Sequence, residues 1–235
     1  MKGALEIIKY AREQTDEIIL FHSANGKDSI VLLDLLTKYF KKVVPVYMYI
    51  VPNLDFANKY IAWSQRKYGV QFIQTPHFAV YSYIRTGFMG MKQDKNQRLH
   101  TLSDIDKYVK EKTGIQWSCY GMKQNDSLNR RLMLRTYEKE GICLQTKKIY
   151  PLTHWSNKDC INYIKGHDLM QNELTLYGAR GQSTGMAVNN LPYLLFSREN
   201  YPNDYKRIIE VYPLAESLVK DYDEELKKEA LDFQQ

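Results

Sequence analysis

Residues 17–33 read EIILFHSANGKDSIVLL, and this stretch decides the fold. Residues 17–21, apolar after Glu17, predict a short buried strand, and the residues after the turn predict a helix that opens at Lys27. Between the two, a turn with Asn25 and Gly26 can direct successive main-chain N–H groups at one point, and the helix adds the positive end of its dipole. The stretch therefore predicts a phosphate-binding loop that follows a buried strand.

The spacing of this loop excludes two common phosphate-binding motifs. A Walker A loop requires a glycine separated by four residues from its Gly-Lys pair, and a Ser or Thr directly after that pair. Phe21 and Asp28 occupy these two places. The chain also contains no G-x-G-x-x-G, so a dinucleotide-binding interpretation has no support.

The loop resembles the PP-loop, the Ser-Gly-Gly-Lys-Asp-Ser signature of the adenine nucleotide alpha-hydrolase superfamily. This superfamily contains ATP pyrophosphatases and phosphoadenosine phosphosulfate (PAPS) reductases. Ala24 and Asn25 stand where the signature has its first Ser and its first Gly. Ser23, one residue earlier, offers a hydroxyl in place of the missing one. Because Asn25 tolerates a positive φ, the turn is expected to survive these changes.

A second motif follows an expected strand that ends near Tyr120. Residues 121–130 read GMKQNDSLNR and resemble the family's Gly-x-Arg-x-x-(Asp/Glu)-Ser-x-x-Arg motif, with Lys123 in place of the first Arg. The resemblance implies that Lys123 and Arg130 each supply a cation to a phosphate or sulfate, and that Ser127 supplies a hydroxyl. Taken alone, the segment is an ordinary helix cap with a surface cation. Its order and spacing relative to the first loop favour the functional interpretation.

A third match and a glycine-rich loop lie further along the chain. Residues 150–159 read YPLTHWSNKD and resemble the Pro-Leu-x-x-Trp-x-x-x-Asp segment that follows the last core strand in PAPS reductase-like proteins. In this segment Trp155 is expected to be a packing ring and Asp159 a helix-start carboxylate. Residues 177–186 resemble the family's Gly-rich region, and the resemblance implies that Arg180 closes over the polyphosphate or the acceptor.

The cysteines argue against the reductase chemistry of the family. Cys119, Cys143 and Cys160 are widely separated and form no C-x-x-C pair, so neither a disulfide framework nor an iron–sulfur or zinc site is expected. In the family's reductases a cysteine near the C-terminus attacks sulfur. Met186 and Asn189 fill the places where the family often has a cysteine pair. A thioether and an amide cannot attack a sulfonucleotide.

The histidines give no sign of a metal site. His22 directly precedes the phosphate loop, and two interpretations stay open: a ring satisfied by the main chain, or a ring that contacts a ligand or donates a proton. The other four show no metal-ligand spacing, so no zinc is assigned to them. They are His77, His100, His154 and His167.

Apolar runs alternate with longer amphipathic stretches, which is typical of a doubly wound α/β fold. We expect a mainly parallel, five-stranded sheet with helices on both faces. The strands are expected near 17–21, 43–50, 71–74, 116–120 and, weakly, 147–150. The helices are expected near 2–14, 28–39, 54–67, 102–112 and 124–138.

The same alternation predicts the domain organisation. Residues 1–170 are expected to form a PP-loop adenine nucleotide-binding α/β domain, and 171–235 a C-terminal loop and helical appendage packed on it. The appendage ends in a helix that Pro213 opens and that runs to about Leu231. The polar, basic residues 91–98 interrupt the alternation and predict an exposed loop.

Composition sets the class of protein and of partner. The chain has 235 residues, 44% of them hydrophobic and 26% charged, as in ordinary soluble proteins. No apolar stretch is long enough to span a bilayer or to serve as a signal peptide, so no membrane contact and a cytoplasmic location are expected. The net charge of +6 suits an anionic ligand and would also suit a nucleic acid.

The resemblance implies an ATP pyrophosphatase-type or PAPS reductase-family enzyme that binds ATP or a related adenine nucleotide and cleaves between the α and β phosphates. Pyrophosphate would leave, and an acceptor that the sequence does not identify would be activated. Asp28 would contact Mg²⁺, and Lys27, Asp28 and Arg130 would be catalytic. The implied nucleotide-binding residues are Ser23, Asn25, Gly26, Lys27, Ser29, Tyr49, Lys123, Ser127, Arg130 and Arg180.

Three other functions stay open at this point. One is a sulfonucleotide reductase that uses thioredoxin, against which the missing cysteine counts. Another is a nucleotide-binding or partner-binding module without catalysis. The last is an enzyme that adenylates a nucleic-acid base, for which the basic charge is the sole support. The chain is also compatible with a homodimer through its last helix, although packing on its own domain is the default expectation.

Overall fold

A computed structural model describes residues 2–137, 139–176 and 187–232. The chain divides into two compact units. The first comprises residues 1–48, 57–75 and 102–172, and the second comprises 49–56, 76–101 and 173–235. The predicted division at residue 170 stays a prediction.

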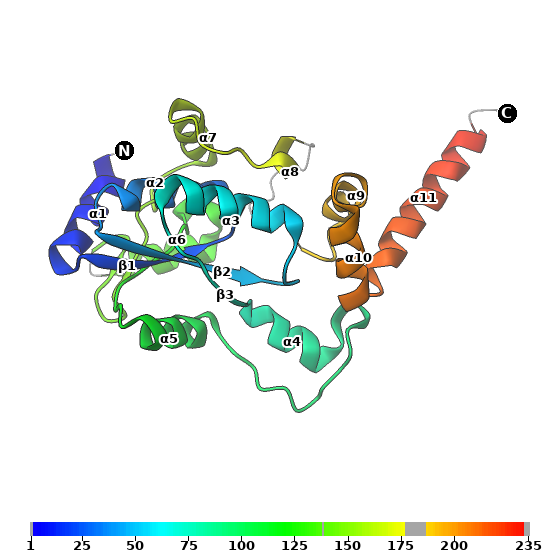
Figure 1. Cartoon of the computed structure of the whole chain (residues 1–235), viewed down its shortest axis with the longest axis horizontal. Helices are drawn as coiled ribbons and strands as arrows, with labels where there is room; N and C mark the ends of the chain where they lie inside the picture. The colour runs from blue at the N-terminus through cyan, green and yellow to red at the C-terminus, as the bar shows by residue number, and fades with distance from the viewer. Residues whose placement is uncertain (1, 138, 177–186, 233–235) are drawn as a thin grey trace. The chain divides into compact units, whose positions relative to one another are not determined.

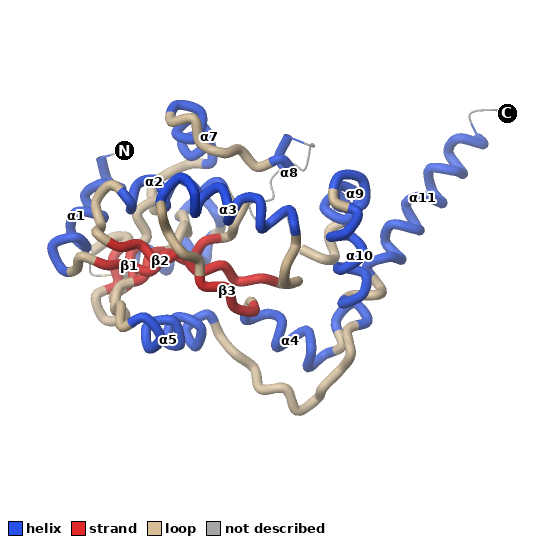
Figure 2. The backbone as a smooth tube through the Cα atoms, in the orientation of Figure 1, coloured by secondary structure: helices blue, strands red, loops and turns tan. Residues whose placement is uncertain are grey.

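The first unit is built on a six-stranded sheet in the order β3-β2-β1-β4-β6-β5. Figure 2 shows the strands β1, β2 and β3 of this sheet. β1 pairs in parallel with both β2 and β4, β4 pairs in parallel with β6, and β5 alone is shown to run antiparallel, against β6. The predicted fold class, a mainly parallel α/β sheet, is confirmed. The strands are β1 (Glu17–His22), β2 (Lys42–Tyr49), β3 (Ile73–Pro76), β4 (Ser118–Cys119), β5 (Ile142–Cys143) and β6 (Lys148–Ile149).

Helices lie over both faces of this sheet: α2 and α3 cover one face and α5 covers the other (Figure 1). The centre of the sheet is dry, because Ile18, Ile19 and Leu20 of β1 have no exposed surface. The helices that alternate with these strands along the chain are α1 (Lys2–Gln14), α2 (Lys27–Thr37), α3 (Asp55–Tyr68), α5 (Leu102–Thr113), α6 (Leu128–Arg135) and α7 (Asn157–Gly166).

One predicted helix is wrong in its extent. In place of a helix over 124–138, a 3-10 turn at Gln124–Asp126 is followed by α6. The break falls at Ser127, which has an extended backbone (φ −167°, ψ 162°) and whose hydroxyl accepts a hydrogen bond from the Arg130 N–H. The side chain of Ser127 therefore starts a new helix instead of continuing the turn.

The second unit is helical. Asp204, which is buried, accepts hydrogen bonds from the N–H groups of Asp55 (2.7 Å) and Phe56 (2.8 Å). It therefore satisfies the amino end of α3, where main-chain donors have no partner within the helix. The elements are α4 (Phe78–Thr86), a 3-10 turn (Phe88–Gly90), α8 (Glu173–Leu176), α9 (Leu191–Asn200), α10 (Pro202–Val211) and α11 (Ala215–Asp232).

The last helix confirms the expectation of a helix from Pro213 to about Leu231. The expected exposed loop over 91–98 carries no helix or strand. Among the described residues, no helix has a stretch that is long and apolar enough to cross a membrane.

Candidate functional site

The loop between β1 and α2 has the predicted place but a different backbone. Ala24 takes the left-handed conformation (φ 50°), whereas Asn25 is not among the described residues with positive φ. Gly26 is extended (φ −69°, ψ 124°) and caps α2. The turn is present, as expected, but its positive φ lies at Ala24 and the tolerance of Asn25 for that conformation is not used. Ala24 has no exposed surface, so the strained residue is held by packing on all sides.

Two serines fasten the loop to the helix that follows it. The main-chain N–H of Ser23 donates to Ser29 Oγ (3.0 Å), and the two hydroxyl oxygens lie 3.0 Å apart. The N–H of Gly26 donates to the main-chain oxygen of Ser23 (3.2 Å). Both serines were predicted to contact a nucleotide. In this structure their hydroxyl groups bind each other and close the turn.

Polar groups without partners gather around this loop. His22 is 3% exposed, and neither of its ring nitrogens has a hydrogen-bond partner among the described residues. Asn25 has no exposed surface; its amide nitrogen donates to Asn172 Oδ1 (3.2 Å), but its own side-chain oxygen has no partner. Such groups are uncommon in folded proteins because they forfeit their hydrogen bonds to water. The loop therefore has hydrogen-bonding capacity that the described residues do not use.

His22 is a neutral side chain in the folded protein. Burial lowers the pKa of its imidazole to about 3. Its ring packs edge-on against Phe72, with 5.2 Å between ring centroids. Of the two interpretations that the sequence left open, a ring satisfied by the main chain is wrong.

An ion-pair chain joins the first loop to the second motif. Lys123 Nζ donates to Asp28 Oδ2 (2.6 Å) and lies 3.2 Å from Asp126 Oδ1, while Arg130 Nη1 lies 2.7 Å from Asp126 Oδ2. Lys27 Nζ also reaches Asp28 Oδ2 (3.2 Å). The structure thus brings together four of the predicted site residues and adds Asp126, for which the sequence suggested only a helix cap.

Lys123 is held between carboxylates and away from solvent. Its side chain is 1% exposed. Burial by itself lowers the pKa of the Lys123 ammonium, but the charge and hydrogen bond of Asp28, and then the charge of Asp126, outweigh burial, so the net pKa is raised. Burial likewise favours the neutral form of Asp126, and the contacts from Lys123 reverse this, so the pKa of Asp126 is lowered. Both groups are therefore charged at neutral pH.

Gly121 permits the two segments to approach. A Cβ atom at this position would lie 3.2 Å from Asp28 Cβ and 3.6 Å from Leu32 Cδ1. A side chain here would push the second motif away from the first turn of α2. The sequence signal was the glycine that opens the motif.

Cys160 lies beside Asp28, which the sequence did not predict. The thiol is fully buried in the first turns of α7. Burial, followed by the charge of Asp28, raises the pKa of Cys160 well above its usual value. No local pattern in the sequence indicates this proximity, because the two residues are brought together only by the packing of α7 on α2.

The structure does not place Tyr49 or Arg180, which were both predicted to bind the nucleotide, at this loop. Tyr49 ends β2 and belongs to the second unit, where its main-chain oxygen accepts a hydrogen bond from the N–H of His77 (2.8 Å). Arg180 and Met186 lie outside the described residues.

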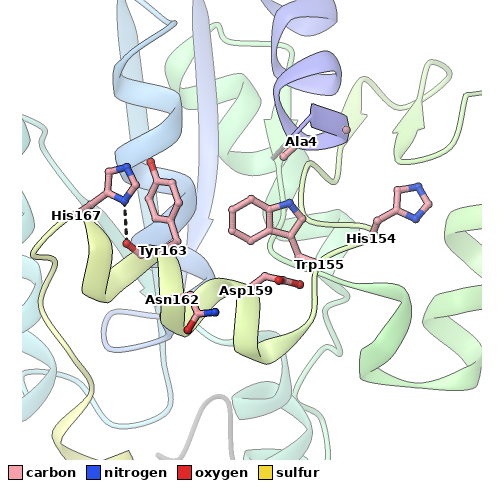
Figure 3. Close-up of a pocket in the computed structure, with 8 residues that line it drawn as sticks. Ala4, His154, Trp155, Asp159, Asn162, Tyr163 and His167 are labelled. Atoms are coloured by element: carbon pink, nitrogen blue, oxygen red, sulfur yellow. Dashed lines mark hydrogen bonds between the residues drawn. The ribbon is translucent and has the colours of Figure 1, made fainter.

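The third motif forms the wall of a separate pocket, of about 470 Å³, between α1 and α7 (Figure 3). The Trp155 and Tyr163 side chains lie side by side along it, and the Tyr163 ring stacks on His167 with 3.8 Å between centroids. Asp159 accepts hydrogen bonds from the N–H (2.7 Å) and hydroxyl (2.7 Å) of Ser156, and so caps α7. The structural roles predicted for Trp155 and Asp159 are confirmed.

The family follows from a comparison of the whole sequence with protein families. The model of the phosphoadenosine phosphosulfate reductase domain matches residues 18–208, which is most of the chain. The chain belongs to this family. The match contains all three motifs, from the loop after β1 to the start of α7, and continues into the second unit.

Two curated relatives in this family are adenosine 5'-phosphosulfate reductases. The one from Staphylococcus saprophyticus is 26% identical over 178 residues, which is 74% of this chain and 72% of the relative. The one from Geobacillus thermodenitrificans is 28% identical over 179 residues, which is 74% of each chain. At these identities the relatives indicate shared ancestry but leave the reaction of this chain open.

Two solved structures also align with the chain. One is the NH3-dependent NAD synthetase from Campylobacter jejuni in complex with nitrate, with a TM-score of 0.49, 11% identity, and coverage of 90% of this chain and 92% of that one. The other is yeast FAD synthetase in complex with FAD, with a TM-score of 0.44, 13% identity, and coverage of 75% and 62%. At these TM-scores neither likeness supports a statement about function.

Proposed function

We propose that this chain binds an adenine nucleotide at the loop Ser23–Ser29 and cleaves ATP between its α and β phosphates, releasing pyrophosphate. The observation that carries the proposal is the set of unused, buried polar groups at the loop, on His22 and Asn25. They adjoin the amino end of α2, whose dipole and main-chain N–H groups favour an anion. A bound nucleotide would supply hydrogen-bond partners to these polar groups and place its phosphates at the amino end of α2.

The residues of the loop are suited to hold the leaving pyrophosphate. Main-chain N–H groups of Asn25 and of residues 27–29 would donate to its oxygens, since the N–H of Gly26 already donates to Ser23. The Lys27 ammonium would neutralise the charge that develops as the bond to the α-phosphorus breaks. Arg130, whose side chain is 44% exposed, is the cation best placed to turn from Asp126 toward a substrate. The loop and Lys27 are in place before the substrate binds, so little reorganisation of these groups opposes the reaction, and Arg130 is the group that moves.

Asp28 fits the role of a magnesium ligand only together with a nucleotide. One of its oxygens, Oδ1, is buried and has no hydrogen-bond partner of normal geometry among the described residues. The described residues contain no cluster of three or more His, Cys, Asp or Glu that would hold a metal by itself. An ion at Asp28 would therefore take its other ligands from phosphate oxygens and water, which Mg²⁺ does readily, and when bound it would neutralise phosphate charge.

A second candidate is reduction of a sulfonucleotide, which the names of the two relatives favour. That reaction requires a thiolate as nucleophile. Residues 161–235 contain no cysteine, and the buried Cys160 beside Asp28 has a raised pKa, so it stays a thiol at neutral pH. The thiol chemistry of these residues therefore counts against reduction.

Calorimetric titration with ATP, adenosine phosphosulfate and PAPS, each with and without Mg²⁺, tests the binding step. We expect ATP with Mg²⁺ to bind most tightly, and Lys27→Ala to weaken this binding. Lys9→Ala, at an exposed position of α1, serves as the control and leaves affinity unchanged. Tighter binding of a sulfonucleotide would count against the proposal.

Turnover distinguishes the remaining candidates. With Mg-ATP and a panel of small nucleophiles, we expect AMP transfer and pyrophosphate release that disappear in Lys27→Ala. Orthophosphate alone would contradict cleavage between the α and β phosphates. Sulfite from a sulfonucleotide in the presence of reduced thioredoxin would establish the second candidate, and binding without turnover would indicate a non-catalytic module.

A further inference from the structure

Helix α6 presents an apolar face that the described residues leave uncovered. Leu128 is 65% exposed and Leu132 is 56% exposed, and both project from the same side of the helix because they are one turn apart. Leu134, on another side, is fully buried and anchors the helix. Two neighbouring leucines exposed to this extent form a small apolar patch of the kind that a partner surface can cover.

Two arginines flank these leucines. Arg131 and Arg135 are exposed, and Leu128, Arg131, Leu132 and Arg135 follow the spacing i, i+3, i+4, i+7, which places them on one helix face. The Arg135 Nε donates to Gln124 Oε1 (3.1 Å) in the 3-10 turn before α6, and the rest of its side chain stays exposed. The face thus combines an apolar pair with a basic pair. We call these four residues the α6 face.

Helix α11 carries the complementary pattern. Its first half packs on α9: Val219 is buried, and Arg198 Nη1 pairs with Asp223 Oδ2 at 2.6 Å. Its second half extends past α9 (Figure 1) and exposes Leu226, at 45%, beside the half-buried Tyr222. Asp221 and Glu225 are exposed next to this apolar pair. We call Asp221, Tyr222, Glu225 and Leu226 the α11 face.

The order of charged and apolar residues fixes how the two faces match. In each face a charged residue comes one position before an apolar one: Arg131 before Leu132, and Glu225 before Leu226. One position is about 100° around a helix. When two helices pack antiparallel, the same offset places both charged pairs on the same side of the seam, so Arg131 and Arg135 would meet the acidic pair while the leucines pack on the apolar pair.

We propose that the α6 face of each chain is covered by the α11 face of a second copy, in a two-fold dimer. Every copy carries both faces, so one symmetry axis generates two identical seams and leaves neither face exposed. This doubles the buried apolar surface relative to a single helix pair, and the facing charges set the antiparallel register. The inference does not depend on the proposed function.

Charge reversal tests this dimer in the full-length chain. We expect wild type to sediment as a dimer at micromolar concentration, and both Arg131→Glu/Arg135→Glu and Asp221→Lys/Glu225→Lys to weaken the dimer at least tenfold and sediment as monomers. The control Lys158→Glu/Lys165→Glu makes the same change of net charge as the first variant on exposed positions of α7, and should remain dimeric. Circular dichroism verifies that each variant is folded.

Mixing the two reversed variants is the decisive measurement. The first variant carries two acidic faces and the second carries two basic faces, so an equal mixture should form a heterodimer with both seams restored. A monomeric wild type would overturn the proposal, whether the α6 face binds α11 of its own chain or an unrelated acidic protein. A dimer that survives either reversal, or a mixture that stays monomeric, would overturn it as well.

Discussion

Lys123 shows how one side chain can join two sequence motifs. Its ammonium lies between Asp28 and Asp126 with almost no exposure, and the three residues come from the start of α2 and from the segment after β4. A charge at such a place is stable only while its partners are present. The motif that this segment resembles has an Arg here, and the Lys keeps the positive charge at the same position.

Replacing Lys123 by Met should therefore destabilise the protein strongly. The variant leaves two carboxylates facing each other in a buried place, so we expect a loss of about 3–5 kcal/mol in the free energy of unfolding. Urea denaturation followed by circular dichroism measures this loss. Adding Asp126→Asn should recover part of the loss because it removes the repulsion between the Asp28 and Asp126 carboxylates; no recovery would show that packing, and not charge, is responsible.

Gly121 provides a second prediction at a single residue. Gly121→Ala places a Cβ atom 3.2 Å from Asp28 Cβ. Relieving this close contact requires a shift of α2 or of the second motif. We expect a loss of about 1–3 kcal/mol in the free energy of unfolding. The control is Gly166→Ala, at the end of α7, where the added atom meets nothing within 4 Å. That change should be neutral or stabilise by up to about 1 kcal/mol. Equal effects of the two substitutions would contradict the close-approach argument.

The elements that the sequence predicted well are those with a long, consistent pattern. β1 and β2 are apolar runs, and α11 repeats its apolar residues over 18 positions, so each was placed within a few residues. β5 was missed because Ile142–Cys143 is too short to show any period. The helix expected over 124–138 failed because Ser127 uses its hydroxyl as a cap, a local choice that periodicity does not register.

In the site, too, the features set by neighbouring residues could be predicted from the sequence, and those set by distant residues could not. The place of the loop and its junction with α2 follow from the residues 17–33 alone. The positive φ at Ala24 was not predictable, because alanine has no intrinsic preference for that conformation and packing imposes it. The approach of Cys160 to Asp28 and the Asn25–Asn172 hydrogen bond depend on residues more than 130 positions apart in the chain, which no local pattern reports.

The start of α7 offers a prediction about an element. Ser156 and Asp159 form a reciprocal capping box, in which the Ser156 hydroxyl accepts from the Asp159 N–H (3.2 Å) and Asp159 accepts from Ser156. Ser156→Ala should cost about 1 kcal/mol of stability, read from the midpoint of urea denaturation. Ser82→Ala, at an exposed interior position of α4, gains helix propensity and should not destabilise. A loss in both variants would indicate that the cap is not the cause.

The stability of the whole molecule should depend on pH through the buried His22 and the half-buried His77. Burial lowers the pKa of His22 to about 3 and also lowers the pKa of His77. The unfolded chain therefore binds more protons than the folded one below the ordinary histidine pKa of about 6.5. Stability is complete above that pH and is lost as pH falls. The pKa values of Asp34 and Asp126 are lowered from 3.8, so these carboxylates change the free energy of unfolding only at more acidic pH.

Between pH 6.5 and 5, we expect His22 to remove about 2 kcal/mol from the free energy of unfolding, at about 1.4 kcal/mol for each pH unit. Urea denaturation at a series of pH values measures this slope, and His22→Leu should flatten it while His77 retains its smaller part. Because leucine needs no hydrogen bond, the variant should match or exceed wild-type stability at pH 5. If His22 also binds the nucleotide, the same variant loses ATP affinity at pH 7. Parallel pH curves for the two proteins would show that His22 does not carry the dependence.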